Sequence, residues 1–339
     1  MALAYGRLAG GGLCARVDGR VLDLSHVAGS LDELMARGPA AWEQARQALD
    51  SANEVAAAEL GLPFEVADYV DFYSSIHHAR NVGLMFRPDA EPLLENWRQL
   101  PVGYHGRAGT VVPSGTAIRR PVGQRGPGDF GPTQALDVEL ELGFVIGVAS
   151  EGPVPVERAL DHVFGAVLLN DWSARDIQGW EYRPLGPLLG KSFATSISQW
   201  VVPLAELEGH RVAAEPQDPE PLPYLREPAW AFDIQLEIEL NGAVIARGNA
   251  RNLYWSIAQQ IAHLTSNGAG LRVGDLLGSG TISGPERDQR GCLLELSWAG
   301  REPIELPDGS TRTFLEDGDE VVLRGEPLGE VRGAILPSR

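Results

Sequence analysis

A mainly β fold of the α+β class, with a rolled or sandwiched sheet, is predicted by three features of the 339-residue sequence. Forty glycines and 24 prolines are scattered between apolar stretches, which is typical of strands joined by many turns. Residues 232–246 alternate on both sides of Asn241-Gly242, the signal of a hairpin with a type I′ turn. Helical spacing is confined to a few segments, so a doubly wound sheet is not expected.

The first ~65 residues are expected to form a small unit without catalytic groups, suited to packing or dimerisation. Glycine and Asp-Gly turns separate predicted strands over residues 2–9, 12–17 and 20–24. Ser30 and Glu33 predict a capping box for a helix over residues 31–35. An alanine-rich helix is predicted over residues 39–59.

The rest of the chain is expected to consist of strands, turns and few helices. The spacing of apolar residues predicts a helix over 252–266, ended by Asn267-Gly268. Short strands with Gly and Asp turns follow it. Near Tyr69 the sequence changes to a pattern of strands, turns and irregular loops. This change predicts a boundary between domains spanning residues 1–66 and 67–339.

Composition excludes several classes of protein. The 46 acidic and 28 basic residues give a net charge of −18, which argues against a nucleic-acid partner. A small carboxylate substrate would need a local cation to overcome this field. No apolar run approaches the ~18 residues of a membrane span, and the two cysteines suggest no disulfide framework. A cytoplasmic protein is therefore expected.

Lys191 is the only lysine among the 28 basic residues, the other 27 being arginines. A coding bias explains most of the arginines but not why one position keeps an amine. An ammonium is compact and can shift its pKa and release a proton, which a guanidinium cannot do. The sequence around it is not a phosphate-binding loop, because Leu185 stands where that motif needs glycine. Lys191 is therefore a candidate functional residue.

Acidic and apolar residues alternate over 135–147, with Asp137, Glu139 and Glu141 on one face of a predicted strand. Alternation alone favours an amphipathic strand with a solvated acidic face. Residues 235–239 show the same alternation in the predicted hairpin. However, two carboxylates about 7 Å apart along a strand can also converge on one hard cation.

A polar stripe follows the apolar strand that ends at Asn170-Asp171. Helical spacing would align four side chains, at i, i+4, i+7 and i+11: Asp171, Arg175, Gln178 and Tyr182. The alternative is a solvated helix face with an Asp–Arg pair.

Residues 71–87 gather a third set of polar groups. They include Asp71, Tyr73, the adjacent His77 and His78, and Arg87. Two histidines could suggest zinc, but no HExxH helix or cysteine set completes such a site. A general base is therefore the better use of one histidine.

These three segments resemble the fumarylacetoacetase family, and the resemblance extends from about Tyr69 to the C-terminus. The shared motifs include DFYSS at 71–75, LPVGYHGRA at 100–108, LDVELE at 136–141, NDWSARDIQ at 170–178, WEYRPLGPLLGKSF at 180–193, SGTISG at 279–284 and TRTFLEDGDEV at 311–321. The resemblance implies a small SH3-like N-terminal domain, a mixed β-sandwich roll and a homodimer.

The resemblance also implies residue roles. His78 would be the general base, oriented by Glu295, and no role is assigned to His77. The metal-binding set would contain the acids Asp71, Glu139, Glu141 and Asp171, which suit Mg²⁺ or Ca²⁺, together with Lys191 and with Thr195 at a second, structural Mg²⁺ position. The catalytic set is completed by Lys191, Arg175 and Gln178, and the substrate contacts are Tyr73, Arg87, Tyr104, Gln178, Tyr182 and Thr281.

The activity implied is metal-dependent hydrolysis of a carbon–carbon bond in 4-fumarylacetoacetate, the last step of tyrosine and phenylalanine breakdown. The substrate would be a small diketo acid. The alternatives are an acylpyruvate hydrolase or oxo-acid decarboxylase of the same superfamily, and a non-catalytic binding protein. The His78–Glu295 pair favours a hydrolase, since a decarboxylase needs no activated water.

Overall fold

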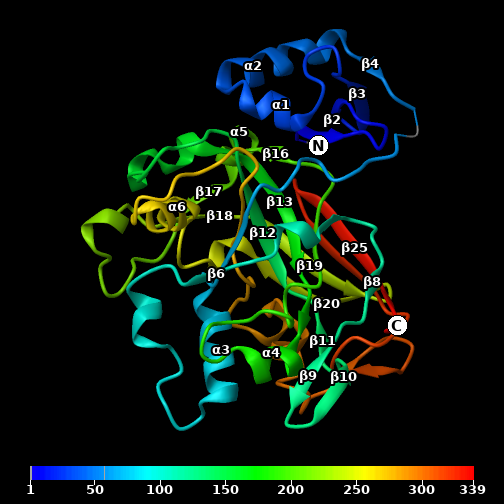
Figure 1. Ribbon diagram of the computed structural model, residues 1–339, viewed down its shortest axis with the longest axis vertical. Coiled ribbons are helices and arrows are strands. Elements are labelled where there is room, and N and C mark those ends of the chain that lie inside the picture. Colours follow the sequence, from blue (N-terminus) through cyan, green and yellow to red (C-terminus); the bar gives the residue numbers. More distant parts are fainter. Residues whose placement is uncertain (1, 57) are drawn as a thin grey trace.

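The computed structural model describes residues 2–56 and 58–339 and shows a mixed α/β fold around a curled eight-stranded sheet (Figure 1). Seven of its strands follow the order β6-β5-β21-β12-β13-β15-β7, and β16 also pairs with β13. Their bounds are β5 Tyr69–Phe72, β6 Gly103–His105, β7 Val111–Pro113, β12 Leu140–Ile146, β13 Val163–Asp171, β15 Thr195–Ile197, β16 Val202–Pro203 and β21 Leu276–Gly278.

A five-stranded sheet packs against this curled sheet, in the order β20-β19-β24-β25-β8. The strands are β8 Ile118–Arg119, β19 Gln235–Leu240, β20 Ala243–Asn249, β24 Glu320–Gly325 and β25 Gly329–Leu336. Asn241 and Gly242 join β19 to β20 with φ of 51° and 83°, which confirms the predicted type I′ turn. Leu140, Leu168 and Leu236 belong to one core that includes residues of both sheets.

The N-terminal unit packs on the other face of the curled sheet. Its sheet contains β1 Ala4–Arg7, β2 Leu13–Val17, β3 Arg20–Asp23 and β4 Asn53–Glu54, with helices α1 Leu31–Ala36 and α2 Pro39–Gln47. Trp42 meets Phe164 of β13 edge to face at 4.9 Å, and Tyr5 forms a bridge with Val201. The N-terminal unit and the curled sheet therefore share a second hydrophobic core.

Two N-terminal predictions need correction. The helix predicted over 39–59 ends at Gln47, where a 3₁₀ turn over Ala48–Ser51 leads into β4. The Ser30 hydroxyl accepts the Glu33 N–H as expected, but the Glu33 carboxylate accepts the N–H of Gly29 at 2.6 Å. The reciprocal bond of a capping box is therefore displaced by one residue.

The remaining helices are short. They are α3 Ile76–Phe86, α4 Arg175–Glu181, α5 Leu204–Leu207, α6 Ile257–Thr265 and α7 Leu293–Leu296. The helix predicted over 252–266 begins later, at Ile257, because Ser256 and Gln259 form a capping box there. Within the described residues, no helix is long and apolar enough to cross a membrane.

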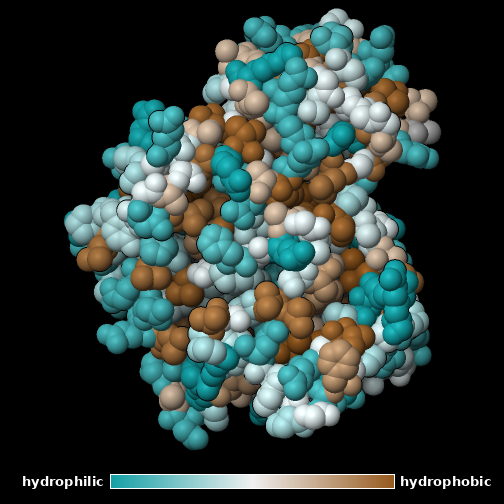
Figure 2. Space-filling model, viewed as in Figure 1, coloured by the Kyte–Doolittle hydropathy of each residue, from teal (hydrophilic) through white to brown (hydrophobic). Residues whose placement is uncertain are grey.

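The short ribbons and 3₁₀ turns complete the chain. The ribbons are β9 Val122–Gly126 with β10 Asp129–Pro132, β11 Leu136–Asp137 with β14 Ser173–Ala174, β17 Arg211–Ala213 with β18 Trp230–Phe232, and β22 Ile304–Glu305 with β23 Thr311–Arg312. Further 3₁₀ turns span Glu95–Arg98, Ala108–Thr110, Val156–His162, Glu208–His210, Pro223–Leu225, Ala250–Asn252 and Arg287–Gln289. Figure 2 shows apolar side chains across the middle of one face, below the N-terminal unit.

Candidate active site

Acidic residues gather on the face of the curled sheet that also carries the N-terminal unit. Alternation along β5 and β13 directs Asp71 and Asp171 to the same face as Tyr69 and Leu169, which belong to the core shared with that unit. Glu139 and Glu141 follow the same alternation into and along β12. Neighbouring strands thus bring acids from three separate segments to one place.

The four carboxylates of Asp71, Glu139, Glu141 and Asp171 form a buried cluster. Each offers an oxygen, and these oxygens all lie within 4.8 Å of one another. The four residues are at most 4% exposed. This arrangement confirms that the acids expected as metal ligands meet in space.

Lys191 and two hydroxyl groups surround Asp171. The Lys191 Nζ lies 2.7 Å from the Asp171 Oδ2 and also forms an ion pair with Glu139. The Thr195 hydroxyl donates to the Asp171 Oδ1 at 2.7 Å, and the Tyr104 hydroxyl donates to the Asp171 Oδ2 at 2.8 Å. The lone lysine therefore belongs to the cluster.

The oxygens that remain unpaired fit a hard divalent cation. Asp71 Oδ1 and Glu141 Oε1 are buried and have no hydrogen-bond partner among the described residues. Gly278 of β21 lies between them, where an added Cβ would come within 2.7 Å of the Asp71 Oδ1 and 3.2 Å of the Glu141 Oε2. These ligands are all oxygens, and the space beside them is free because Gly278 has no side chain. Such a set suits Mg²⁺ or Ca²⁺ better than a softer ion.

The electrostatics of the cluster also favour a cation. Burial and the neighbouring Asp171 raise the pKa of Asp71 to about 8, and burial with Asp71 raises the pKa of Glu141 well above its ordinary value. Burial would also raise the pKa of Glu139, but Arg175 and Lys191 overcome this and hold it below its ordinary value. Two of the four acids thus favour a proton that a divalent ion would displace.

Neighbouring carboxylates keep the Lys191 amine protonated in the metal-free cluster. Burial alone would lower the pKa of Lys191, but Asp171 and Glu139 raise it above its ordinary value. The amine therefore stays an ammonium that neutralises charge.

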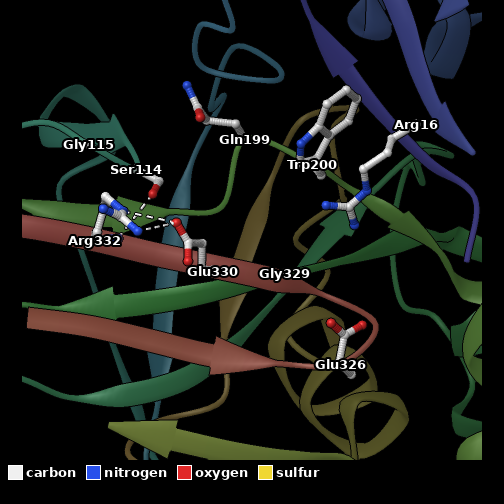
Figure 3. Close-up of a pocket in the computed structure, with 9 residues that line it drawn as sticks. All are labelled: Arg16, Ser114, Gly115, Gln199, Trp200, Glu326, Gly329, Glu330 and Arg332. Carbon is white, nitrogen blue, oxygen red and sulfur yellow. Dashed lines mark hydrogen bonds and ion pairs between the residues drawn. The ribbon is translucent and has the colours of Figure 1, made fainter. Parts of the chain in front are cut away.

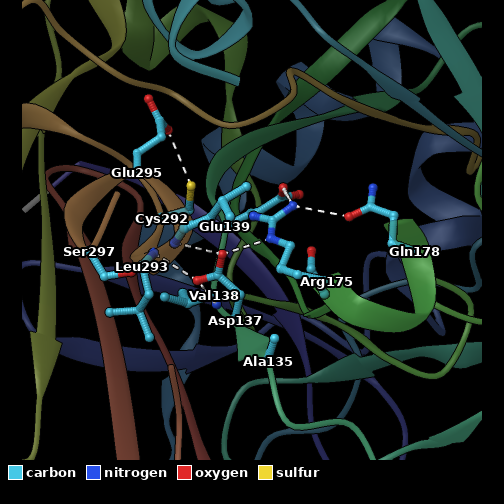
Figure 4. A network of polar contacts seen from close by, with 12 residues as sticks. Ala135, Asp137, Val138, Glu139, Arg175, Gln178, Cys292, Leu293, Glu295 and Ser297 are labelled. Atoms are coloured by element: carbon cyan, nitrogen blue, oxygen red, sulfur yellow. Dashed lines mark hydrogen bonds and ion pairs between the residues drawn. The ribbon is translucent and has the colours of Figure 1, made fainter. Parts of the chain in front are cut away.

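Arg175 joins the cluster from the start of α4, held by Asp137. Its Nε donates to the Asp137 Oδ2 and its Nη1 contacts the Glu139 Oε1, both at 2.7 Å (Figure 4). Its Nη1 also donates to the Gln178 Oε1 at 3.3 Å. The predicted helical stripe is correct only from Arg175 onward, because Asp171 is the last residue of β13.

Asp137 is a buried residue to which sequence reasoning assigned no role. Besides Arg175, its carboxylate accepts the N–H groups of Leu293 and Leu294 at 2.7 and 3.0 Å (Figure 4). It therefore connects Arg175 to the segment that carries Glu295. The only sequence signal was its place on the same strand face as Glu139 and Glu141.

His78 and Glu295 form a buried pair, as the resemblance implies. The His78 Nδ1 lies 2.6 Å from the Glu295 Oε2, and the Asn81 amide donates to the Glu295 Oε1 at 2.8 Å. Burial would raise the pKa of Glu295, but His78, Asn81 and Ser283 lower it to about 2. A carboxylate beside Nδ1 assigns the proton to that nitrogen and leaves the Nε2 lone pair free. Sequence reasoning assigned no role to Asn81 or Ser283, although Asn81 lies in the polar segment 71–87 and Ser283 in the SGTISG motif.

The residues expected to contact substrate divide into two groups. The Tyr73 ring packs edge to face on His78 at 5.1 Å, and the residue before Thr281, Gly280, donates its N–H to the Glu141 Oε2. Arg87, by contrast, directly follows α3 and donates to the Pro92 carbonyl at 2.7 Å, and Tyr182 is 37% exposed directly after α4. No contact in the described chain brings Arg87 or Tyr182 to the cluster.

A pocket of about 140 Å³ opens onto the cluster. Asp171 and Lys191 line it together with Tyr69, Tyr104, His105, Gly106, Arg107, Pro187, Leu188 and Ser192. A larger cavity, of about 390 Å³, lies elsewhere, beside Arg16, Trp200 and Arg332 (Figure 3). Arg332 pairs there with Glu330 at 2.8 Å, and none of the four clustered acids reaches it. The smaller pocket is therefore the one that serves the site.

A buried four-carboxylate cluster beside a histidine–glutamate pair defines a candidate divalent-metal active site on a mixed α/β fold. The chain belongs to the fumarylacetoacetate hydrolase family. Residues 69–336 match the family described as the fumarylacetoacetate (FAA) hydrolase C-terminal domain.

Curated relatives support this membership over most of the chain. The sequence is 47% identical to a fumarylacetoacetase of Bos taurus over 91% of this chain and 84% of that protein. It is 48% identical to a fumarylacetoacetase of Arabidopsis thaliana over 91% of this chain and 83% of that protein.

Solved structures share the fold. A fumarylacetoacetate hydrolase of Exiguobacterium antarcticum has a TM-score of 0.66 at 18% identity, over the whole of both chains. A maleylpyruvate hydrolase of Sphingobium sp. SYK-6, solved with manganese(II) and pyruvate, has a TM-score of 0.62 at 16% identity, over 99% of this chain and all of that chain.

Proposed function

We propose that the protein hydrolyses a carbon–carbon bond of 4-fumarylacetoacetate to give fumarate and acetoacetate. The single observation that carries this proposal is the buried cluster of Asp71, Glu139, Glu141 and Asp171 close to the His78–Glu295 pair. Close relatives that bear the name fumarylacetoacetase support the choice of substrate.

The four acids would hold a divalent cation, Mg²⁺ or Ca²⁺, which would polarise the carbonyl under attack. The Nε2 of His78 takes a proton from water, while Glu295 keeps the Nδ1 proton in place. The resulting hydroxide adds to the carbonyl carbon.

The oxyanion formed by this addition needs positioned donors. Arg175, Gln178 and Lys191 supply them beside Glu139, and each donor in such a site is worth about 2.7–4 kcal/mol. The carbon–carbon bond then breaks, and its electron pair leaves on acetoacetate as an enolate. The raised pKa of Lys191 favours His78, which holds the proton from water, as the group that protonates this carbon.

The carboxylate ends of the substrate require cations and hydroxyl groups. We assign them to Tyr73, Arg87, Tyr104, Tyr182 and Thr281, following the family resemblance. Arg87 and Tyr182 would have to move from their present contacts to serve in this way.

The family resemblance supports several finer proposals. We propose that residues 1–66 form an SH3-like domain, that residues 67–339 form a β-sandwich roll, and that the chain is a cytoplasmic homodimer acting in tyrosine and phenylalanine breakdown. Exposed apolar side chains, such as Leu185 and the pocket-lining Leu188, are suited to burial against a second copy.

The function is tested by following the loss of the diketone absorbance of fumarylacetoacetate with purified protein. Turnover should disappear with a chelator and return with Mg²⁺ or Ca²⁺. His78→Ala should abolish turnover and leave metal binding nearly intact, because His78 is not among the four acids. Turnover of an acylpyruvate instead, or decarboxylation of an oxo acid that survives His78→Ala, would overturn the proposal in favour of those rivals.

A further inference from the structure

A second set of converging ligand atoms lies beside the carboxylate cluster. His78 of α3 and Cys292 and Glu295 at α7 each offer a ligand atom, and these atoms lie within 4.8 Å of one another. All three residues are at most 2% exposed. Figure 4 shows the Cys292 thiol directed at the Glu295 carboxylate, to which it donates at 3.1 Å.

The chemistry of this set differs from that of the four acids. One sulfur, one imidazole nitrogen and one carboxylate oxygen are the donors of Zn²⁺ sites, whereas oxygen-only sets suit Mg²⁺ and Ca²⁺. Three protein ligands with a free fourth position match a tetrahedral ion.

The charges around Cys292 favour a cation. Burial raises the pKa of the Cys292 thiol, the negative charges of Glu295, Asp137 and Glu139 raise it further, and Arg175 opposes them, so the thiol keeps its proton until a cation replaces it. A divalent ion bound by the Glu295 carboxylate and a Cys292 thiolate would be neutral overall, so its burial carries no net charge.

We propose that His78, Cys292 and Glu295 form a second metal site, which takes Zn²⁺ and inhibits the enzyme. At present the Cys292 thiol and the His78 Nδ1 each share a proton with the Glu295 carboxylate. Zn²⁺ replaces both protons and binds all three side chains directly. The thiol proton leaves to solvent, and the imidazole keeps one proton by moving it to Nε2.

This shift of the imidazole proton explains the inhibition. With Nδ1 bound to Zn²⁺ and a proton on Nε2, His78 has no lone pair left to accept a proton from water. The inhibition rests on the proposed function of His78, but the binding of Zn²⁺ does not. Because the three ligands are buried, we expect inhibition to develop slowly after Zn²⁺ is added.

The test uses the full-length protein saturated with Mg²⁺, which keeps the four-carboxylate cluster filled. Co²⁺, which takes the same ligands as Zn²⁺, is titrated while the thiolate-to-cobalt charge-transfer band is recorded. Zn²⁺ inhibition is measured separately by turnover of the diketone. Cys292→Ser is compared with Cys14→Ser, which changes the other buried cysteine.

We expect the charge-transfer band in the unchanged protein and in Cys14→Ser, and its loss in Cys292→Ser. Cys292→Ser should keep basal turnover and weaken Zn²⁺ inhibition by about 100-fold or more, since even an indirect partner of a metal is worth 10–100-fold in affinity. Equal Zn²⁺ inhibition of both variants without a cobalt–thiolate band would overturn the site and place Zn²⁺ at the carboxylates. If the cobalt–thiolate band requires Cys292 but the protein does not hydrolyse fumarylacetoacetate, the metal site is supported and the proposed function is rejected.

Discussion

Two strands of this protein carry the same alternation of acidic and apolar residues and use it in opposite ways. In β19 the Glu237 and Glu239 side chains are 35% and 20% exposed, and they pair with Arg247 and Arg324 near the surface. Along β11 and β12 the equivalent acids, Asp137, Glu139 and Glu141, are at most 4% exposed. The solvated face that alternation favours is therefore found in β19 and is wrong for β11 and β12.

Alternation determines on which face of the sheet a side chain lies, but it does not determine which groups pack over that face. The acids of β11 and β12 are buried because two further carboxylates, Lys191 and Arg175 arrive from distant segments and surround them. Burial of so many like charges is unfavourable unless cations compensate, which is typical of a functional site. The β19 acids need only water and surface arginines.

The largest effect should come from removing the charge of a buried acid, compared with removing the charge of an exposed acid on β19. Glu141→Gln should lower turnover by about 10³-fold or more, since polarisation by a metal supplies several kcal/mol and each 1.36 kcal/mol is tenfold. Divalent-ion affinity, measured by calorimetry, should fall with it. Glu237→Gln is the matched control and should leave both unchanged. Equal effects in the two variants would remove the distinction between the strands.

A slightly smaller loss of turnover is expected when the ammonium beside the buried acids is replaced by a guanidinium, which has a different shape. Lys191→Arg keeps the charge, but a planar guanidinium cannot fill the position of an ammonium that contacts both Asp171 and Glu139. We expect turnover to fall by about 10²–10³-fold, as for the loss of one oxyanion donor. Arg247→Lys, beside Glu237, should change neither activity nor stability measurably. Near-normal turnover of Lys191→Arg would make the lone lysine a coincidence.

Asp137→Asn tests whether the third buried acid acts through Arg175. An amide keeps an oxygen but loses the charge that holds the Arg175 Nε at 2.7 Å. Breaking a buried pair costs about 3–5 kcal/mol of stability, whereas Glu239→Gln at the surface should cost less than about 1 kcal/mol. Denaturant unfolding measures both. We also expect kcat to fall more than KM rises; unchanged kcat would limit Asp137 to a structural role.

The last effect concerns the pH dependence of stability. In the metal-free protein the pKa of Asp71 is about 8, against an ordinary value of 3.8. Between these values the folded state holds a proton that the unfolded state lacks, so stability should fall as pH rises, by about 1.4 kcal/mol per unit for one group. Unfolding at pH 5 and pH 8 with chelator measures this slope. A bound divalent ion should remove it, and a metal-free slope of opposite sign would contradict the assigned burial.

The sequence predicted some features well because they depend on local chemistry. The Asn241-Gly242 turn needs only two residues that tolerate positive φ, and both have it. The helix predicted to reach Glu59 failed because alanine-rich composition cannot reveal the pairing of β4 with β3. The stripe from Asp171 failed at its first residue because a strand continues through that position.

The active site was predictable only where motifs identified it. Clustering of Asp71, Glu139, Glu141 and Asp171 followed from the resemblance, since three separate segments carry no mutual signal in one sequence. Their burial, the anchoring of Arg175 by Asp137 and the contact of Arg87 with Pro92 depend on tertiary packing. Local patterns contain no information about such contacts.

The location of the divalent ion tests the account most directly. Crystals soaked with Mn²⁺ and measured for anomalous scattering should show a peak among the carboxylates of Asp71, Glu139, Glu141 and Asp171, and Glu141→Gln crystals should lose it. No peak there in the unchanged protein, or an ion bound beside Glu237 and Glu239 instead, would contradict the claim that these two similar strands have different tasks.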